Sequence, residues 1–551
     1  MTHHTDTPAA PSAAIPIVRI EGLSVALPEG ADRPYAVDHT SIDMYAGRIL
    51  CVVGESGSGK SMSANAMMGL LPEGVRAVKG RILLGDENLL AFSEEKMRDI
   101  RGRRIGMIFQ EPMSALNPLM RVADQIAEVF EAHGLLTPAE RQARAVELLT
   151  EVGLPDPKRA ARAYPFQLSG GQRQRVVIAM ALALEPEVLI ADEPTTALDV
   201  TTQAQILALI RKLQVERGMA VMFITHDFGV VAEIADDVVV MQCGQIVEQG
   251  PARAVLDAPQ HDYTQRLLAA IPRLTLAPRA MPDFAPLLEV RDIRRTYVSG
   301  GGLFRPVRRV DAVRDVSFTL GKGETLGIVG ESGSGKSSLG RCLVRLQPAD
   351  AGSVTMEGRE ILDLKGEDLR QLHRRVQMIF QDPFSSLNPR ITVGRTIADG
   401  PIAFGMSRAE AMDRARALLE RVGLNAAAAT RYPHEFSGGQ RQRIGIARAL
   451  ALEPEVIVAD EAVSALDVSI QAQVLELLDE IKRDLGLSLI FITHDLRVAA
   501  QICDRVMVMQ QGACIEIGPA HQIFSAPEQA YTRSLIEAIP GRARDLAGQA
   551  A

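Results

Sequence analysis

The chain has 551 residues and a net charge of −8, and a length prior of about 150 residues per domain predicts three or four structural units. Hydrophobic residues make up 47% and charged residues 23%, so wholesale disorder and a fibrous repeat are excluded. An acidic chain with no tryptophan and 7 tyrosines is also a poor match for a protein that coats nucleic acid, because phosphate neutralisation and base stacking lack the side chains they need.

The first 16 residues are polar and rich in Ala, Pro and Thr, so we expect a disordered lead-in rather than a secretory signal. The longest apolar run, Val176–Leu184, is well short of the roughly 18 residues that a membrane-spanning helix needs. Five scattered cysteines without a CxxC pair are typical of a protein from a reducing cytoplasm.

A predicted strand, Ile49–Val53, leads into the glycine-rich sequence GESGSGKS. This pattern between a strand and a helix forms a phosphate cradle, because successive N–H groups and the helix N-terminus point at the anion. The lysine would neutralise phosphate charge, and the last serine would hold Mg²⁺. The predicted nucleotide-binding residues are Gly54, Glu55, Ser56, Gly57, Ser58, Gly59, Lys60 and Ser61.

Two features follow along the chain. Gln110 ends an apolar strand, and its amide can either ligate Mg²⁺ or orient water. The region Asp124–Leu149 then has the spacing of apolar residues that predicts a helical insertion. The sequence LSGGQ precedes a helical run, Arg173–Leu184, which predicts a second anion site at a helix N-terminus. Because one triphosphate needs only the first loop, we expect this second surface to cap the nucleotide of a partner copy. Its residues are Ser169, Gly170, Gly171 and Gln172.

Acidic and imidazole side chains come next, each after an apolar strand. Asp192 ends the run VLIAD, a place that suits the surroundings of Mg²⁺ beside a phosphate loop. Glu193 follows directly and suits the polarisation of an attacking water. His226, in FITHD, is expected to contact the γ-phosphate.

All of these motifs recur in the second half of the chain, and two copies of one fold are therefore predicted. Ser169 and Asp192 are 23 positions apart, as are Ser437 and Asp460. Asp192 and His226 are 34 positions apart, as are their second copies. The second set of site residues is Gly330, Glu331, Ser332, Gly333, Ser334, Gly335, Lys336, Ser337, Gln381, Ser437, Gly438, Gly439, Gln440, Asp460, Glu461 and His494.

Both copies alternate short runs rich in Val and Ile with longer helical patterns, which is typical of an α/β fold with a parallel sheet covered by helices. Thr325–Val329 is the second strand before a glycine loop, and Arg408–Val422 the second helical insertion. Leu274–Pro286 holds three prolines and is predicted to be a linker. The expected organisation is a lead-in at 1–16, domains at 17–273 and 287–543 joined by the linker 274–286, and a tail at 544–551.

The ordered set of motifs, together with the ALD segments Ala197–Asp199 and Ala465–Asp467, resembles the ATPase subunits of ABC transporters from about residue 18 to residue 540. The resemblance implies tandem P-loop nucleotide-binding domains, each with a RecA-like parallel-sheet core, an antiparallel β subdomain and a helical subdomain. The sequences QEPMSALNP (Gln110–Pro118) and PQHDYTQRLLAAIP (Pro259–Pro272) are similar to those of dipeptide, oligopeptide and nickel importers. Ala459–Ile470 is especially like the second half of glutathione-importer ATPases.

In that family two such domains close head to tail around two ATP molecules. The resemblance implies that each site is capped by the SGGQ segment of the other copy and that both sites hydrolyse ATP. The catalytic residues would be Glu193, His226, Glu461 and His494, and the Mg²⁺ ligands would be Ser61, Gln110, Asp192, Ser337, Gln381 and Asp460.

The resemblance also implies partners: two integral-membrane permeases and an extracytoplasmic substrate-binding protein, with this chain on the cytoplasmic face of the bacterial inner membrane and no nucleic acid bound. The permeases would dock around Glu111–Pro118 and Asp382–Pro389. The apolar residues there fit a partner surface, and core packing explains them equally well. They are Met113, Leu116, Phe384 and Leu387.

Two features depart from the family pattern, and an arginine-rich stretch is a separate observation. Many relatives carry a cysteine-rich tail, and its absence here predicts that no iron–sulfur cluster is bound. Tyr297 is the expected adenine-stacking residue of the second copy, whereas the first copy has Leu27 at that position, with Tyr35 as the runner-up. The six arginines of Arg294–Arg314 indicate either a solvated loop or an anion-binding patch.

Other classes of protein share some of these motifs. A soluble ABC-type ATPase of translation or DNA repair is the main alternative, but the short prolyl linker and the lack of zinc-finger insertions disfavour it. An efflux ATPase is disfavoured by the tandem fusion and the YP-x-x-[LF]-SGGQ context. A regulatory module without turnover is disfavoured because both carboxylate and histidine sets are intact.

Overall fold

The computed structural model describes residues 15–110, 115–196, 198–272, 274, 283–299, 308–382, 386–464 and 466–542. Residues 1–14 of the predicted lead-in, the predicted tail, and Ala197 and Ala465 of the ALD segments lie outside these ranges. The chain divides into two compact units, the first comprising Met1–Leu198 and Thr202–Ala269, and the second comprising Ala270–Ala551 together with the short segment Asp199–Thr201.

The core of the first unit is a six-stranded sheet with the order β10-β9-β3-β8-β7-β6. Neighbouring strands from β9 to β6 run parallel, and only β10 at the edge is antiparallel. Strands β3, β7 and β8 are buried along their whole length, which explains why they are continuous apolar runs rather than alternating ones. The strands are β3 (Ile49–Val53), β6 (Ile105–Ile108), β7 (Val188–Asp192), β8 (Ala220–Ile224), β9 (Asp237–Gln242) and β10 (Gln245–Pro251).

A four-stranded antiparallel sheet with the order β2-β1-β4-β5 packs against this core. Ile20 of the antiparallel sheet and Val52 and Ile190 of the core sheet belong to one buried apolar cluster, which joins the two sheets. The strands are β1 (Val18–Ala26), β2 (Tyr35–Met44), β4 (Arg76–Leu84) and β5 (Glu87–Asn88).

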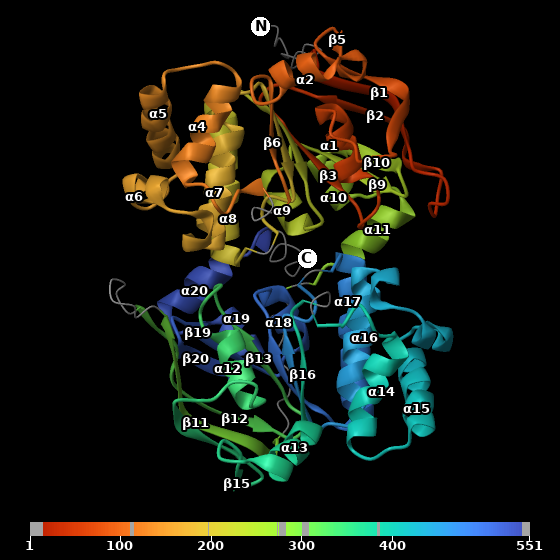
Figure 1. The fold of residues 1–551 in the computed structure, drawn as a ribbon, viewed down its shortest axis with the longest axis vertical. Coiled ribbons are helices and arrows are strands. Elements are labelled where there is room, and N and C mark those ends of the chain that lie inside the picture. The colour runs from red at the N-terminus through yellow and green to blue at the C-terminus, as the bar shows by residue number, and fades with distance from the viewer. Residues whose placement is uncertain are drawn as a thin grey trace, which may run out of the picture. The chain divides into compact units, whose positions relative to one another are not determined.

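The helices α4 to α7 form a separate layer beside the core sheet of the first unit (Figure 1). The predicted helical insertion is confirmed but is divided, because Thr137 caps a new helix and Pro138 occupies its first position. The helices are α1 (Lys60–Met68), α2 (Glu94–Ile100), α4 (Val122–Ala132), α5 (Pro138–Glu151), α6 (Pro157–Arg162), α7 (Gly170–Ala181), α8 (Val200–Arg217), α9 (Phe228–Ile234), α10 (Ala252–Asp257) and α11 (Asp262–Ala269).

The second unit repeats this architecture, with a six-stranded sheet of order β16-β17-β18-β13-β19-β20 and a four-stranded sheet of order β12-β11-β14-β15. The predicted α/β fold and its duplication are therefore confirmed. Its strands are β11 (Pro286–Ser299), β12 (Arg308–Gly321), β13 (Thr325–Val329), β14 (Ala351–Met356), β15 (Arg359–Glu360), β16 (Val376–Ile379), β17 (Val456–Asp460), β18 (Ser488–Ile492), β19 (Arg505–Gln510) and β20 (Ala513–Pro519).

The helices of the second unit also follow the first, and the predicted insertion at 408–422 corresponds to α15. Within the described ranges, none of the helices has the length and apolar character to cross a bilayer. The helices are α12 (Lys336–Leu343), α13 (Gly366–Arg375), α14 (Val393–Ala403), α15 (Arg408–Arg421), α16 (Gly438–Leu450), α17 (Val468–Leu485), α18 (Leu496–Ile502), α19 (Ala520–Ser525) and α20 (Ala530–Glu537).

Candidate nucleotide sites

The phosphate loop of the first unit connects β3 to α1, as the sequence predicts. Lys60 is only 6% exposed, and its ammonium donates hydrogen bonds to the carbonyl oxygens of Gly54 (2.7 Å) and Glu55 (2.8 Å). The lysine therefore folds back over its own loop and holds the anion-binding turn closed.

The second unit has the same loop between β13 and α12. Lys336 donates to the carbonyl oxygens of Gly330 and Glu331, both at 2.8 Å. Burial lowers the pKa of Lys336, and the negative charge of Glu461 opposes that effect. A buried ammonium whose hydrogen bonds go to neutral carbonyl and hydroxyl oxygens is a strong binding site for an anion such as a phosphate group.

An oxygen pair lies at the end of each loop. The Ser61 hydroxyl donates to Oδ1 of Asp192 at 3.0 Å, and Ser337 donates to Asp460 at 2.7 Å. Burial raises the pKa of Asp192 and of Asp460, although the serine hydrogen bond in each case acts in the opposite direction. A hydroxyl and a buried carboxylate supply the hard oxygen atoms that Mg²⁺ prefers.

Glu193 directly follows β7 in a left-handed backbone conformation (φ 46°), and its N–H donates to the Ile224 carbonyl at 2.9 Å. A non-glycine residue in this region is rare and marks a strained position, a feature that clusters at functional sites. Glu461 repeats the conformation (φ 48°) and the bond, to Ile492. In both units the carboxylate is near the lysine of the phosphate loop, whose charge acts on it.

The Glu193 carboxylate is held by three side chains. Gln110 donates to it at 3.0 Å and Thr196 at 2.9 Å, and Nδ1 of His226 lies 3.3 Å from its second oxygen. Burial would raise the pKa of Glu193, but the hydrogen bond and charge of His226, with smaller contributions from Thr196 and Lys60, lower it to about 2. The carboxylate is therefore ionised at neutral pH.

The second carboxylate differs from the first in one contact. Gln381 donates to Glu461 at 2.8 Å, and His494 lies 3.4 Å from it, but Ser464 donates to the backbone carbonyl of Glu461 instead of its side chain. His494 and Lys336 outweigh burial and lower the pKa of Glu461. The pKa of His494 is raised, because the interaction with Glu461 exceeds the effect of burial.

The SGGQ segments begin α7 and α16, one turn earlier than the predicted helical runs. In each, the serine hydroxyl accepts from the glutamine N–H, and the glutamine side chain accepts from the serine N–H. The serines Ser169 and Ser437 are exposed, and both segments are preorganised as helix N-termini. A Cβ on Gly171 would lie 2.4 Å from Thr202, so α8 packs too closely for any larger residue.

Tyr297, the predicted adenine-stacking residue, lies next to the first turn of α12. Its hydroxyl contacts the side chains of Gln347 and Ser338, and the guanidinium of Arg295 lies 5.0 Å from the ring centre. Arg295 covers one ring face, so a stacked base would have to use the other.

The predicted docking segments are described only in part, because residues 111–114 and 383–385, which include Met113 and Phe384, lie outside the described ranges. Leu116 and Leu387 are 3% and 2% exposed. These two leucines are core residues, so the partner-surface interpretation is wrong for them.

The arginine-rich stretch is likewise described on either side of residues 300–307. Arg294 is paired with Asp315, and Arg295 lies 2.9 Å from Asp350. These two cations belong to ion pairs within the antiparallel sheet region.

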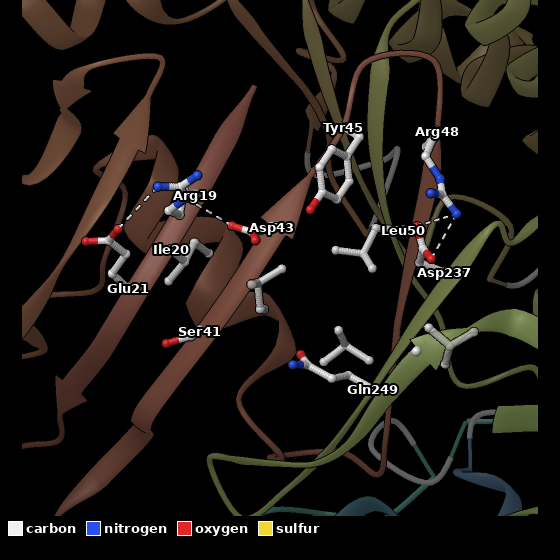
Figure 2. A pocket seen from close by; sticks show the side chains of 14 residues that line it. Arg19, Ile20, Glu21, Ser41, Asp43, Tyr45, Arg48, Leu50, Asp237 and Gln249 are labelled. Atoms are coloured by element: carbon white, nitrogen blue, oxygen red, sulfur yellow. Dashed lines mark hydrogen bonds and ion pairs between the residues drawn. The ribbon is translucent and has the colours of Figure 1, made fainter. Parts of the chain in front are cut away.

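A cavity of about 760 Å³ lies between the two sheets of the first unit, away from the carboxylate site. In Figure 2, Arg19 lies between Glu21 and Asp43, while Arg48 reaches Asp237 at 2.9 Å. Since both arginines face carboxylates, the cavity does not resemble a phosphate site.

Some contacts of the site were not predicted. Thr196 is three residues after Glu193, but no spacing rule assigns it to the carboxylate. Gln125 lies on the buried face of α4, where it accepts from the Asn117 N–H at 2.9 Å and so fixes the backbone at Asn117. A glutamine within an apolar helical pattern is the signal that could have identified it.

Comparison with known proteins identifies the family to which the chain belongs. The ABC transporter family matches residues 37–196 and 313–464, and the family described as "Oligopeptide/dipeptide transporter, C-terminal region" matches residues 247–288 and 515–548. The chain therefore belongs to the ABC transporter ATP-binding proteins of the oligopeptide/dipeptide type, and it is an ATPase with two ATP-binding domains.

Individual relatives are similar along nearly their whole length. The peptidoglycan transport ATP-binding protein YejF of Agrobacterium fabrum is 46% identical over 95% of this chain and 96% of its own. The glutathione import ATP-binding protein GsiA of Escherichia coli O157:H7 is 47% identical over 95% of this chain and 89% of its own. Among solved structures, the dimeric post-hydrolysis state of the cassette MJ0796 with ADP and Pi is 28% identical over 42% of this chain and 99% of its own, with a TM-score of 0.39.

Proposed function

We propose that ATP hydrolysis by this chain powers the import of small peptides through a separate pair of permeases, fed by an extracytoplasmic substrate-binding protein. The observation that carries this proposal is the oligopeptide-type C-terminal region, which follows the ATPase motifs in both halves of the chain. Relatives named for import of glutathione and transport of peptidoglycan support a peptide-like cargo. Such a subunit would work at the cytoplasmic face of the bacterial inner membrane.

In the proposed mechanism, the loop amides and Lys60 or Lys336 bind the phosphates of ATP. The ionised carboxylate of Glu193 or Glu461 accepts a proton or hydrogen bond from the attacking water and aligns it with the γ-phosphate. Nδ1 of His226 and of His494 lies 3.3 and 3.4 Å from these carboxylates, so each histidine orients the carboxylate beside the transferred group.

The serine and aspartate pairs fit a magnesium ion that accompanies ATP, with the amide of Gln110 or Gln381 as a further oxygen ligand. Within the described residues no group of three His, Cys, Asp or Glu side chains could hold a metal, so the ion would depend on Ser61 and Asp192, or Ser337 and Asp460, together with the phosphates. When bound, Mg²⁺ neutralises charge on the β- and γ-phosphates. We retain the expectation that no iron–sulfur cluster is bound.

We further propose that each ATP is capped by the SGGQ segment of the other half. The N-termini of α7 and α16 are preorganised anion sites whose cap serines are exposed, and each unit already has a phosphate loop for one triphosphate. Ser437–Gln440 would cap the first site and Ser169–Gln172 the second.

Permease docking is supported by an apolar groove in the second unit. A cavity of about 280 Å³ is lined by the end of α12, β16, α14 and α16, next to the strand that leads to Gln381. Arg448 lies over the Phe380 ring at its floor, 5.6 Å from the ring centre. A short apolar helix of a permease would fit here, at the junction of the core sheet and the helical layer.

The first unit presents apolar side chains at the matching place. Leu70 and Phe109 are 39% and 41% exposed, and they occupy the positions that match Leu346 and Phe380 of the groove in the second unit. The position of Arg448 is occupied by Met180 in this unit, so the two surfaces differ in charge. That difference supports docking of two non-identical permeases.

An affinity pull-down from detergent-solubilised native membranes, read by mass spectrometry, tests the function. We expect the wild-type chain and a Val215→Glu control, changed at an exposed residue of α8 outside the groove, to recover two multi-spanning permeases. Phe109→Glu with Leu70→Glu should recover fewer permeases. Recovery of ribosomal or repair proteins without permeases would overturn the import proposal and leave the ATPase activity.

A further inference from the structure

The oligopeptide-type region of the first unit contacts its phosphate loop through a tyrosine. Tyr263, at the start of α11, is 4% exposed, and its hydroxyl accepts a hydrogen bond from the backbone N–H of Glu55 at 3.1 Å. The two residues are 208 positions apart in the sequence. This contact ties a region outside the ATPase motifs to the second residue of the anion-binding turn.

The segment that carries Tyr263 is itself fixed to the core sheet. Glu248 of β10 accepts from the N–H groups of Gln260 (2.8 Å) and His261 (3.1 Å). The Nδ1 of His261 then accepts from the Tyr263 N–H at 3.1 Å and begins the helix. A chain of hydrogen bonds therefore runs from the sheet edge through this segment to the phosphate loop.

The second unit repeats the arrangement with a different helix start. Glu516 of β20 accepts from the N–H groups of Glu528 (2.9 Å) and Gln529 (3.2 Å), and the Tyr531 hydroxyl accepts from the Glu331 N–H at 3.4 Å. Burial raises the pKa of Tyr531 to about 12, so the phenol stays neutral. The histidine is replaced by Gln529, yet the tyrosine contact remains, which indicates that the tyrosine is the feature retained in both copies.

The position of this bond determines what it can do. The same Glu55 residue is held at its carbonyl by Lys60 (2.8 Å) and at its N–H by Tyr263. In the proposed mechanism Lys60 also binds the phosphates of ATP, so its ammonium is shared between the ligand and the Glu55 carbonyl. The Tyr263 hydroxyl engages the Glu55 N–H and not the lysine, so this bond can hold the turn in its anion-binding shape while Lys60 and the later N–H groups of the loop bind phosphate.

We propose that Tyr263 and Tyr531 are positioning residues that preorganise the two phosphate loops for ATP. They do not contact the reacting atoms, so their effect falls on ATP binding and not on the chemical step. In this way the region that marks peptide importers becomes part of the nucleotide site.

The test compares Tyr263→Phe with Tyr531→Phe in one chain against wild type, by steady-state ATPase kinetics, equilibrium binding of a fluorescent ATP analogue and thermal unfolding. Removal of both hydroxyls should raise the KM and the analogue Kd about fivefold, the effect of one lost hydrogen bond per site, with kcat within about twofold. The rings are kept and each unit loses one hydrogen bond of about 1 kcal/mol, so the Tm should fall by only about 2–4 °C.

Two control variants make the result specific. Tyr45→Phe removes a hydroxyl from the cavity of Figure 2 and should leave all three readouts unchanged. His261→Gln gives the first unit the residue of the second and should leave KM unchanged; a fivefold rise there would place the positioning role in the histidine. An unchanged KM in the phenylalanine variant, or a fall in Tm beyond this range together with a fall in kcat, would overturn the proposal.

Discussion

The last glycine of each phosphate loop is a sharp test of how the loop is built. Gly335 has a φ of 100°, and a Cβ there would lie 2.0 Å from the Ala312 carbonyl oxygen of β12. Gly333, two residues earlier, has a φ of 79°, and nothing lies within 4 Å of its Cβ position. Gly335→Ala and Gly333→Ala are therefore a matched pair. Both place an alanine in a left-handed backbone conformation, but only Gly335→Ala also places its Cβ against the Ala312 carbonyl.

The expected magnitudes follow from these two contributions. A left-handed backbone costs a residue with a Cβ about 1–2 kcal/mol, and forcing an atom against packed backbone adds about 1–3 kcal/mol. Since 1 kcal/mol shifts the Tm of a domain of this size by about 2–4 °C, Gly333→Ala should lower the Tm by about 3–5 °C. Gly335→Ala should lower it by about 10 °C.

Differential scanning calorimetry without nucleotide measures this directly, because the clash is with β12 and not with a ligand. The first unit offers an independent repeat, since a Cβ on Gly59 would lie 2.5 Å from the Ala36 carbonyl, whereas one on Gly57 meets only Arg33 at 3.9 Å. Equal shifts for the two members of either pair would refute the steric reasoning.

Three further predictions concern charged pairs. The pKa of Glu193 is lowered from 4.5 to about 2, so its ionisation contributes about 3 kcal/mol of stability above pH 4.5, which is lost as the pH falls toward 2; Glu193→Gln should flatten that acid limb in urea unfolding at pH 6 and pH 3.5. The pKa of His494 is raised, so its contribution is full below pH 6.5 and is lost as the pH rises through the folded-state value; His494→Gln should remove this decline in unfolding measured from pH 6 to 9. Arg48 forms an ion pair with Asp237, and the second unit has the reversed pair of Glu324 and Arg505 at 3.1 Å. Arg48→Glu alone should therefore lower the unfolding free energy by about 0.5–1 kcal/mol, and adding Asp237→Arg should restore it. A double variant no more stable than the single one would contradict this.

Much of the site could be predicted from the sequence because its members follow strands at fixed spacing. Lys60, Asp192 and His226 come after buried strands whose carboxyl ends meet at one edge of the sheet, so local pattern alone places them together. Ser61 and Asp192 illustrate the outcome, since they lie 131 residues apart and make a hydrogen bond of 3.0 Å.

The remaining features depend on tertiary packing that no periodicity encodes. Leu116 is apolar, as a residue at a partner surface would be, but it is buried in the turn before α4. Thr196 and Ser464 occupy equivalent positions and donate to different acceptors, because small rotations decide between a carboxylate and a backbone carbonyl. The contact of Tyr263 with Glu55 joins segments from opposite ends of the first unit, and only the folded sheet brings them together.

The most direct test of the account is steady-state ATPase activity of the purified chain carrying Glu193→Gln and Glu461→Gln, together with retention of radiolabelled ATP. Each substitution keeps the shape of the side chain and removes the negative charge that would align water. We predict that hydrolysis falls at least a hundredfold while two ATP molecules per chain remain bound. Undiminished hydrolysis would contradict the assignment of these two carboxylates as the catalytic groups.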